Sequence, residues 1–179
     1  MQPSAALSTY RANYPLKPMR IEPANSDQIV LMTTGDGLLE MPAAPANNEE
    51  ITRPKSLPNT SDKAAEARYL WVIRAEDVPV ALEECEWSRK LQDKKIKHSN
   101  LTSGKPAHSG GEIWFISDDR IAINANSGRY GAESNDELQQ IVDALRTCGF
   151  YVTSMGFDID NTSRPNSILI GEPEWQPPT

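Results

Sequence analysis

The chain has 179 residues, of which 38% are hydrophobic and 24% are charged, and its formal net charge is −7. That length suits one ordinary domain, or a small domain with a tail. No apolar run approaches the roughly 18 residues that a membrane span needs, so we expect no transmembrane helix and no membrane partner. The acidic balance makes nucleic acid an unfavourable partner. Two cysteines and two histidines build a four-ligand zinc site only if all four converge, and we predict no metal site.

The composition divides the chain near residue 65. Residues 1–65 hold 8 of the 14 prolines and only two aromatic side chains, Tyr10 and Tyr14, whereas all tryptophans and phenylalanines follow. Large aromatic side chains dominate the burial of apolar surface in a core. We therefore predict a compact domain over residues 66–179, preceded over residues 1–65 by an extended Pro-rich tail that contains a short hairpin.

Stretches rich in β-branched and aromatic residues predict the strands. The clearest pair is Glu112–Ile116 and Arg120–Asn124, because Ser117-Asp118-Asp119 between them has the composition of a turn. The other expected strands, of which the first two form the hairpin of the tail around Gly35-Asp36-Gly37, are Asp27–Met32, Leu38–Met41, Arg68–Arg74, Val78–Leu82, Ile96–Leu101, Phe150–Met155 and Ser167–Ile170.

One long helix is predicted over Asn135–Cys148. Ser134 is a favourable N-cap, and Glu137 three residues later completes a capping box. Gly149 supplies the left-handed residue at which the helix ends. The fold class is therefore α+β, with a mostly antiparallel sheet and one main helix packed on it. The apolar stripe that faces the sheet consists of Leu138, Ile141, Val142, Leu145 and Cys148.

Three side chains are candidates for catalysis. His98 can orient a hydroxyl or act as a base near neutral pH, although a lone histidine is often a structural donor. Glu112 is either a buried acid that faces His98 or an ordinary charge at a strand end. Tyr130 either stacks on the ring of a ligand or forms part of the core.

Polar residues before and after the predicted hairpin of residues 112–124 are candidates for substrate binding, because polar loops offer amides and hydroxyls to a ligand. The same Asn126-Ser127-Gly128 stretch also suits an Asx-type turn, which needs no ligand. The basic stretch over residues 89–105 is either a solvated face or an anion site. The candidates are Ser99, Asn100, Asn126, Ser127, Gly128 and Arg129.

The sequence also bears on the compartment. Cys85 and Cys148 are expected to be thiols, so nothing requires an oxidising compartment. The N-terminal residues lack a charged region followed by an apolar core, so no secretory signal is expected. We predict a cytoplasmic protein, with delivery into a host or target cell left open.

Three motifs follow one another in a fixed order along the domain. They are His98-Ser99-Asn100-Leu101, Gly111-Glu112-Ile113 and Ser127-Gly128-Arg129-Tyr130. This set, within residues 68–157, resembles a domain of bacterial polymorphic toxins and secreted effectors. It also resembles the C-terminal region of plant IQ-motif calmodulin-binding proteins. The chain carries Arg129 where the usual pattern has His, and it lacks an evident IQ motif, so calmodulin binding is not implied.

The order His, Tyr and Glu is also similar to that of ADP-ribosyltransferases. The resemblance implies that His98 contacts the ribose of NAD and that Tyr130 stacks on nicotinamide. The acid of these enzymes follows the tyrosine at the start of a strand. Here Glu112 precedes the tyrosine, whereas Glu172 and Glu174 come after an expected strand.

Two functions are carried forward from the sequence. The first is a small binding or modulator protein of the toxin, effector or immunity type. It would act on another protein with a basic surface and use no cofactor, because acidic surfaces complement basic ones and speed association. The alternative is an NAD-dependent, ADP-ribosyltransferase-like effector enzyme.

Overall fold

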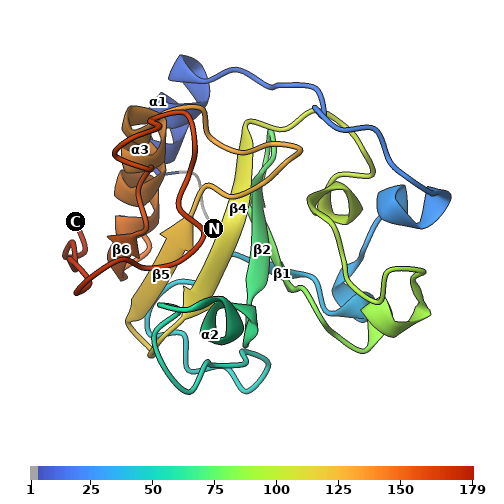
Figure 1. Cartoon of the computed structure of the whole chain (residues 1–179), viewed down its shortest axis with the longest axis horizontal. Helices are drawn as coiled ribbons and strands as arrows, with labels where there is room; N and C mark the ends of the chain where they lie inside the picture. The colour runs from blue at the N-terminus through green and yellow to red at the C-terminus, as the bar shows by residue number, and fades with distance from the viewer. Residues whose placement is uncertain (1–3) are drawn as a thin grey trace.

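The computed structural model describes residues 4–179, and its centre is a six-stranded sheet in the order β1-β3-β2-β4-β5-β6 (Figure 1). Neighbouring strands are antiparallel except β5 and β6, which are parallel. The predicted α+β class is confirmed, with α3 as the main helix. The strands are β1 (Leu39–Glu40), β2 (Tyr69–Ile73), β3 (Pro79–Leu82), β4 (Ser109–Phe115), β5 (Arg120–Asn124) and β6 (Tyr151–Ser154). The helices are α1 (Ala5–Asn13), α2 (Ser61–Ala65), α3 (Asn135–Arg146) and the 3-10 turns η1 (Ser26–Ile29), η2 (Thr34–Asp36), η3 (Trp87–Lys90) and η4 (His98–Leu101).

Helix α3 makes the crossover that parallel strands β5 and β6 require. Its N-cap is as predicted, because Ser134 Oγ accepts a hydrogen bond of 3.1 Å from the amide of Glu137. The helix ends before Gly149, which has a φ of +91°. In a capping box, the carboxylate of Glu137 would accept a hydrogen bond from the amide of Ser134. Here it accepts from the amide of Glu133, one residue earlier, at 2.8 Å.

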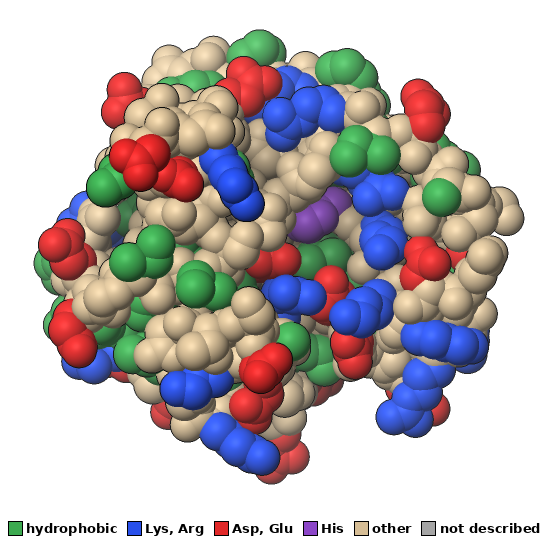
Figure 2. Space-filling model, viewed as in Figure 1, with side chains coloured by type: hydrophobic (Ala, Val, Ile, Leu, Met, Phe, Trp, Pro, Cys, Tyr) green, Lys and Arg blue, Asp and Glu red, His purple; other side chains and the backbone are tan. Residues whose placement is uncertain are grey.

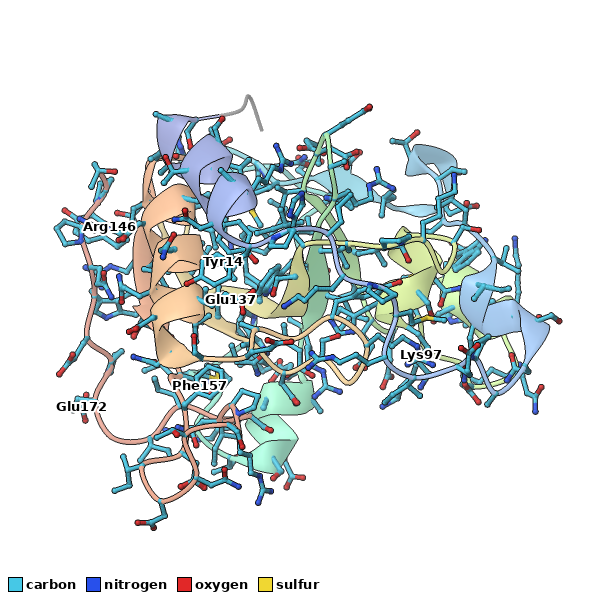
Figure 3. The ribbon with its side chains drawn as sticks, turned by 90° about the horizontal axis from the view of Figure 1, so that it is seen from above. Tyr14, Lys97, Glu137, Arg146, Phe157 and Glu172 are labelled. Carbon is cyan, nitrogen blue, oxygen red and sulfur yellow. The ribbon has the colours of Figure 1, made fainter. Side chains whose placement is uncertain are left out.

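Helix α1 packs beside α3 on the same face of the sheet (Figure 3). Leu7 and Tyr10 are buried in the cluster that also contains the apolar stripe of α3. The Tyr10 hydroxyl donates to Glu137 Oε1 at 2.9 Å, and Lys17 Nζ donates to the same oxygen at 3.2 Å. These bonds fix the N-terminal helix on the domain.

Residues 4–65 therefore do not extend away from the sheet as a tail. Met41, Ala46 and Ile51 join the same cluster as Tyr10, and Tyr69 of β2 accepts a hydrogen bond of 2.8 Å from the amide of Thr52. The composition argument counted large aromatic side chains, whereas this segment enters the core through smaller apolar ones. The segment is rich in proline because it wraps around the domain with little regular hydrogen bonding.

Two separate apolar clusters cover the opposite face of the sheet. The strip of sheet between them carries polar side chains, of which Glu112 and Asn124 are buried. The first cluster lies beneath η1, η4 and the chain around them, and its buried members are Met32, Leu70, Val72, Ala81, Leu91, Ile96, Leu101, Ala107 and Tyr130. The second lies beneath α2, and its buried members are Ala64, Trp114, Ala122, Met155 and Leu169.

The strands predicted at residues 68–74, 78–82, 112–116, 120–124 and 150–155 are confirmed as β2 to β6. Three other strand predictions are wrong. Asp27–Met32 contains η1, Ile96–Leu101 contains η4, and Ser167–Ile170 has no strand. Leu38–Met41 contains β1, which pairs with β3, so the predicted hairpin is also wrong. In the three segments that are not strands, Met32, Ile96, Leu101 and Leu169 are buried in an apolar cluster without a neighbouring strand on which to form a ladder.

The two outer edges of the sheet differ in how they are covered. Strand β1 is only two residues long and forms one edge. At the other edge, Gln176 pairs with Val152 of β6 through two backbone hydrogen bonds of 2.9 Å each. The C-terminal segment thus occupies the outer side of β6. No helix within residues 4–179 is long and apolar enough to cross a membrane.

We predict that Tyr10→Phe lowers the free energy of unfolding by about 1–3 kcal/mol, because the buried Glu137 carboxylate loses a hydrogen-bond donor. Tyr14→Phe is the matched control, since the Tyr14 hydroxyl only accepts from Gln140 at 3.2 Å and lies at a half-buried position. Urea unfolding followed by tryptophan fluorescence measures both variants. Equal losses in the two variants would contradict the role given to Glu137.

Candidate binding cleft

The polar strip of the sheet forms the floor of a cleft between the two apolar clusters. Side chains alternate along a strand, so Gly110 and Glu112 of β4 face the same side, whereas Gly111 faces the other. The register places Glu112 between Leu70 of β2 and Asn124 of β5. Figure 2 shows a hollow near the centre of this face, with a histidine inside it and Lys and Arg side chains beside it.

His98, on the turn η4, is buried against β4. Its Nε2 lies 2.9 Å from the carbonyl oxygen of Gly111, so Nε2 carries the hydrogen and donates. Burial lowers the pKa of His98 to about 4. The positive charges of Arg129, Arg68 and Lys97 act in the same direction, and the bond to Gly111 opposes them. At neutral pH the ring is therefore uncharged, and it is a weak base.

Tyr130 also packs over Gly110, but its hydroxyl points away from the cleft. A Cβ added to Gly110 would lie 3.2 Å from His98 Cδ2 and 3.4 Å from Tyr130 Cβ, so a larger residue here would make these neighbours shift. The Tyr130 hydroxyl donates to the carbonyl of Lys105 and accepts from Thr102, each at 2.9 Å. The side chain is fully buried. The structure therefore favours the core alternative for Tyr130 over stacking on a ligand.

Glu112 is the buried acid of the two alternatives. Its Oε2 accepts a hydrogen bond of 2.7 Å from Asn124 Nδ2, and its Oε1 lies 3.6 Å from Arg68. Burial raises the pKa of Glu112, while Asn124 and Arg68 oppose the shift. Arg68 gives its shorter bonds, of 2.9 and 2.6 Å, to Glu83. The carboxylate of Glu112 is thus held at the floor of the cleft by neighbouring side chains.

Ser99 and Asn100 hold the backbone of residues 26–32, a segment that we call the strap. Ser99 Oγ donates to the carbonyl of Gln28, and Asn100 Nδ2 donates to the carbonyls of Asp27 and Val30 at 2.8 and 2.9 Å. The carbonyl of Asn100 in turn accepts from the amide of Met32 at 2.9 Å. These two substrate-binding candidates therefore bind this chain's own strap.

The loop after β5 is a turn organised by its own side chains. Ser127 Oγ accepts from the amides of Arg129 and Tyr130 at 3.3 and 3.1 Å. Asn126 Nδ2 donates to Ser167 Oγ at 3.2 Å, in the segment that follows β6. Gly128 is exposed and lies close to Ile21, in the segment before the strap, because a Cβ added to Gly128 would lie 2.8 Å from Ile21 Cδ1.

Arg129 is the one member of this loop whose charge acts on His98. Its Nη2 donates to Gln28 Oε1 at 2.7 Å, and Gln28 also donates to Asp93 at 2.9 Å. The link from Arg129 through Gln28 to Asp93 was not visible in the sequence, because the three residues are far apart along the chain. The same holds for Arg68, which no motif marks as a neighbour of Glu112.

The acids near the C-terminus lie elsewhere. Glu172 and Glu174 border a separate cavity of about 150 Å³ beside β6. Figure 3 shows Glu172 and Lys97 on opposite sides of the molecule. Neither acid therefore belongs to the cleft that contains His98 and Glu112.

No family model, curated protein or solved structure matches the chain. The resemblances to toxin and effector domains, to IQ-motif proteins and to ADP-ribosyltransferases stay predictions from the motifs.

The lowered pKa of His98 predicts a loss of stability in acid. The neutral ring stabilises the fold fully above about pH 6.5, its unfolded pKa, and this contribution is lost as the pH falls toward 4. Between pH 7.5 and 4.5, we expect wild type to lose about 2 kcal/mol more free energy of unfolding than His98→Asn. Denaturant unfolding at several pH values measures this difference. Parallel pH profiles for the two proteins would show that His98 is not buried in the neutral form.

Proposed function

We propose that this chain is a small protein-binding modulator of the toxin, effector or immunity type, and that it binds its partner through the strap. The observation that carries the proposal is a run of three apolar side chains on the strap. Ile29, Val30 and Leu31 are 36%, 46% and 45% exposed. Contiguous exposed apolar side chains on a folded protein are typical of interaction sites.

The strap holds these side chains outward on a fixed backbone. Its carbonyls face the domain, where Ser99, Asn100 and Ser103 donate to them; the Ser103 bond to Ile29 is 3.0 Å long. Because the polar backbone faces inward, the apolar side chains face solvent. A surface that is already ordered loses little conformational entropy on binding.

A second exposed apolar group lies just before the strap. Leu16 and Ile21 are 45% and 50% exposed, and Ile21 reaches the loop at Gly128. Exposed apolar side chains thus occur on the N-terminal segment before the strap as well as on the strap. The net charge of −7 favours a partner with a basic surface, since opposite charges speed association.

The polar groups of the cleft support a binding role over a transferase. The ring of Tyr130 is fully buried, so it is unavailable for stacking on nicotinamide. The Nε2 of His98 is engaged by Gly111, and its lowered pKa makes it a weak base. His98, Tyr130 and Glu112, the residues that resemble a transferase triad, lie on the same side of the sheet. Their polar atoms bind different partners, which are Gly111, Lys105 and Asn124.

The strap is tested with Val30→Asp, which places a charge on the apolar surface without removing a hydrogen bond of the strap backbone. Ile170→Asp is the matched control, because Ile170 is 70% exposed and lies outside the strap. Partners captured by cross-linking are purified, and their affinities are measured by calorimetry. We expect Val30→Asp to weaken binding at least about tenfold while Ile170→Asp leaves it unchanged. Equal affinities of both variants and wild type would overturn the proposal.

The transferase alternative is tested by incubating the full chain with NAD and measuring released nicotinamide. We expect no release above that in buffer, because Tyr130 is buried and His98 is a weak base. Glu112→Gln is the comparison variant. Of the three candidate acids, Glu112, Glu172 and Glu174, Glu112 is the one that lies at the floor of the cleft. Release by wild type that disappears in Glu112→Gln would establish an enzyme and refute the binding-only function.

A further inference from the structure

We propose that the cleft beside His98 is a binding site for a phosphate monoester, held by Arg129 and Lys97 and recognised by the His98 ring. The ligand would carry one phosphoryl group with three unesterified oxygens. The proposal does not use the exposed apolar side chains of the strap, because it rests on side chains at the floor and rim of the cleft.

The position of the cleft leaves room for a ligand on the sheet. The two apolar clusters cover the ends of this face and stop on either side of Glu112. In Figure 2, the hollow at this place lies open on the surface, with Lys and Arg side chains on one side of the histidine and acidic side chains close to it. An open polar hollow between two apolar covers is a typical setting for a small ligand.

Arg129 has donors that the protein does not use. Its side chain forms one hydrogen bond, of 2.7 Å, to the amide oxygen of Gln28, and its buried Nε has no acceptor within residues 4–179. A guanidinium has five N–H donors and matches the geometry of phosphate oxygens. Arg129 is therefore prepared for an anionic acceptor, which a small movement of the side chain would bring within reach.

Lys97 supplies the second cation. Its Nζ lies 3.8 Å from Asp93, beyond hydrogen-bond distance, and its side chain is 32% exposed. Arg68 is different, because its guanidinium is already shared between Glu83 and Glu112. The cations offered to a ligand are thus Arg129 and Lys97, and the carboxylate of Asp93 offsets part of their charge.

The ring of His98 selects among anions. Nε2 donates to Gly111, so Nδ1 is an acceptor, and no hydrogen bond engages Nδ1 within residues 4–179. An acceptor in this place favours an anion that carries a proton of its own. A phosphate monoester has such a P–O–H group below its second pKa of about 6, whereas a diester or a carboxylate is fully ionised at that pH.

These properties predict a particular dependence on pH. The charged groups that act on the His98 ring are Arg129, Arg68 and Lys97. Two carboxylates lie beside these cations, Glu112 at 3.6 Å from Arg68 and Asp93 at 3.8 Å from Lys97. Burial, with the three cations acting in the same direction, keeps the ring neutral down to about pH 4. The affinity for a phosphate monoester should therefore be higher at pH 6 than at pH 8, as the fraction of the protonated monoanion falls.

The test is a titration of the full chain, followed by the NMR signals of the His98 ring and by calorimetry. The probes are inorganic phosphate, glucose 6-phosphate and a short phosphoserine peptide. Glucose, the unphosphorylated peptide and dimethyl phosphate are the controls. We expect saturable binding of all three probes, tighter at pH 6 than at pH 8, and none of the controls. Tighter binding of the sugar phosphate identifies a free metabolite as the source of the phosphoryl group, and tighter binding of the peptide identifies a modified protein.

Arg129→Gln should weaken binding about tenfold, the loss of one charge-assisted hydrogen bond. Arg129→Lys, which keeps the charge, should recover part of the affinity. Arg89→Gln, which removes an exposed cation on η3, should leave it unchanged. Thermal unfolding of each variant confirms that it is folded. No saturable shift of the His98 signals with any probe, or equal affinity of Arg129→Gln and wild type, would overturn the proposal.

Discussion

The strap depends on side-chain hydrogen bonds in place of a neighbouring strand. Its carbonyls accept from Ser99, Asn100 and Ser103, and its last amide donates to the carbonyl of Asn100. Buried backbone groups must be paired, so these few donors decide whether the segment can lie against the domain. When the strap lies against the domain, Met32 is buried in the first apolar cluster. Gln28 then reaches Arg129 at the rim of the cleft, so the surface and the cleft share one support.

Glu137 and Glu112 are both buried glutamates, but they differ in the number of hydrogen-bond donors around the carboxylate. Glu137 is surrounded by donors from Tyr10, Lys17 and the amide of Glu133, which satisfy its carboxylate and join α1 to α3. Glu112 has one short bond, to Asn124, and a longer contact with an arginine that it shares. Burial costs a charge less when more donors surround it. The first carboxylate therefore acts as a structural anchor, whereas the second has fewer donors and a pKa that burial raises.

Local patterns were sufficient to predict some elements. Arg120–Asn124 matches β5 residue for residue, and Ser134 caps α3 as expected, because a strand pattern and an N-cap are set by adjacent residues. The wrapping of residues 4–65 is a long-range effect, since it depends on Tyr10 meeting Glu137 across the chain. The candidate site divides in the same way. Its motifs do meet around Gly110, but which atom of each side chain faces the cleft depends on partners such as Gly111 and Lys105, which no motif indicates.

The pairing of Gln176 with Val152 limits how copies of this protein can associate through the edge of the sheet. An exposed strand edge is a template on which another chain can add a strand, and this is a common route to aggregation. Here one edge is covered by the chain's own C-terminal segment, and the other ends in a strand of two residues. Both edges are thus poor templates, so the protein can keep an apolar surface in water without offering a backbone ladder on which self-association would grow.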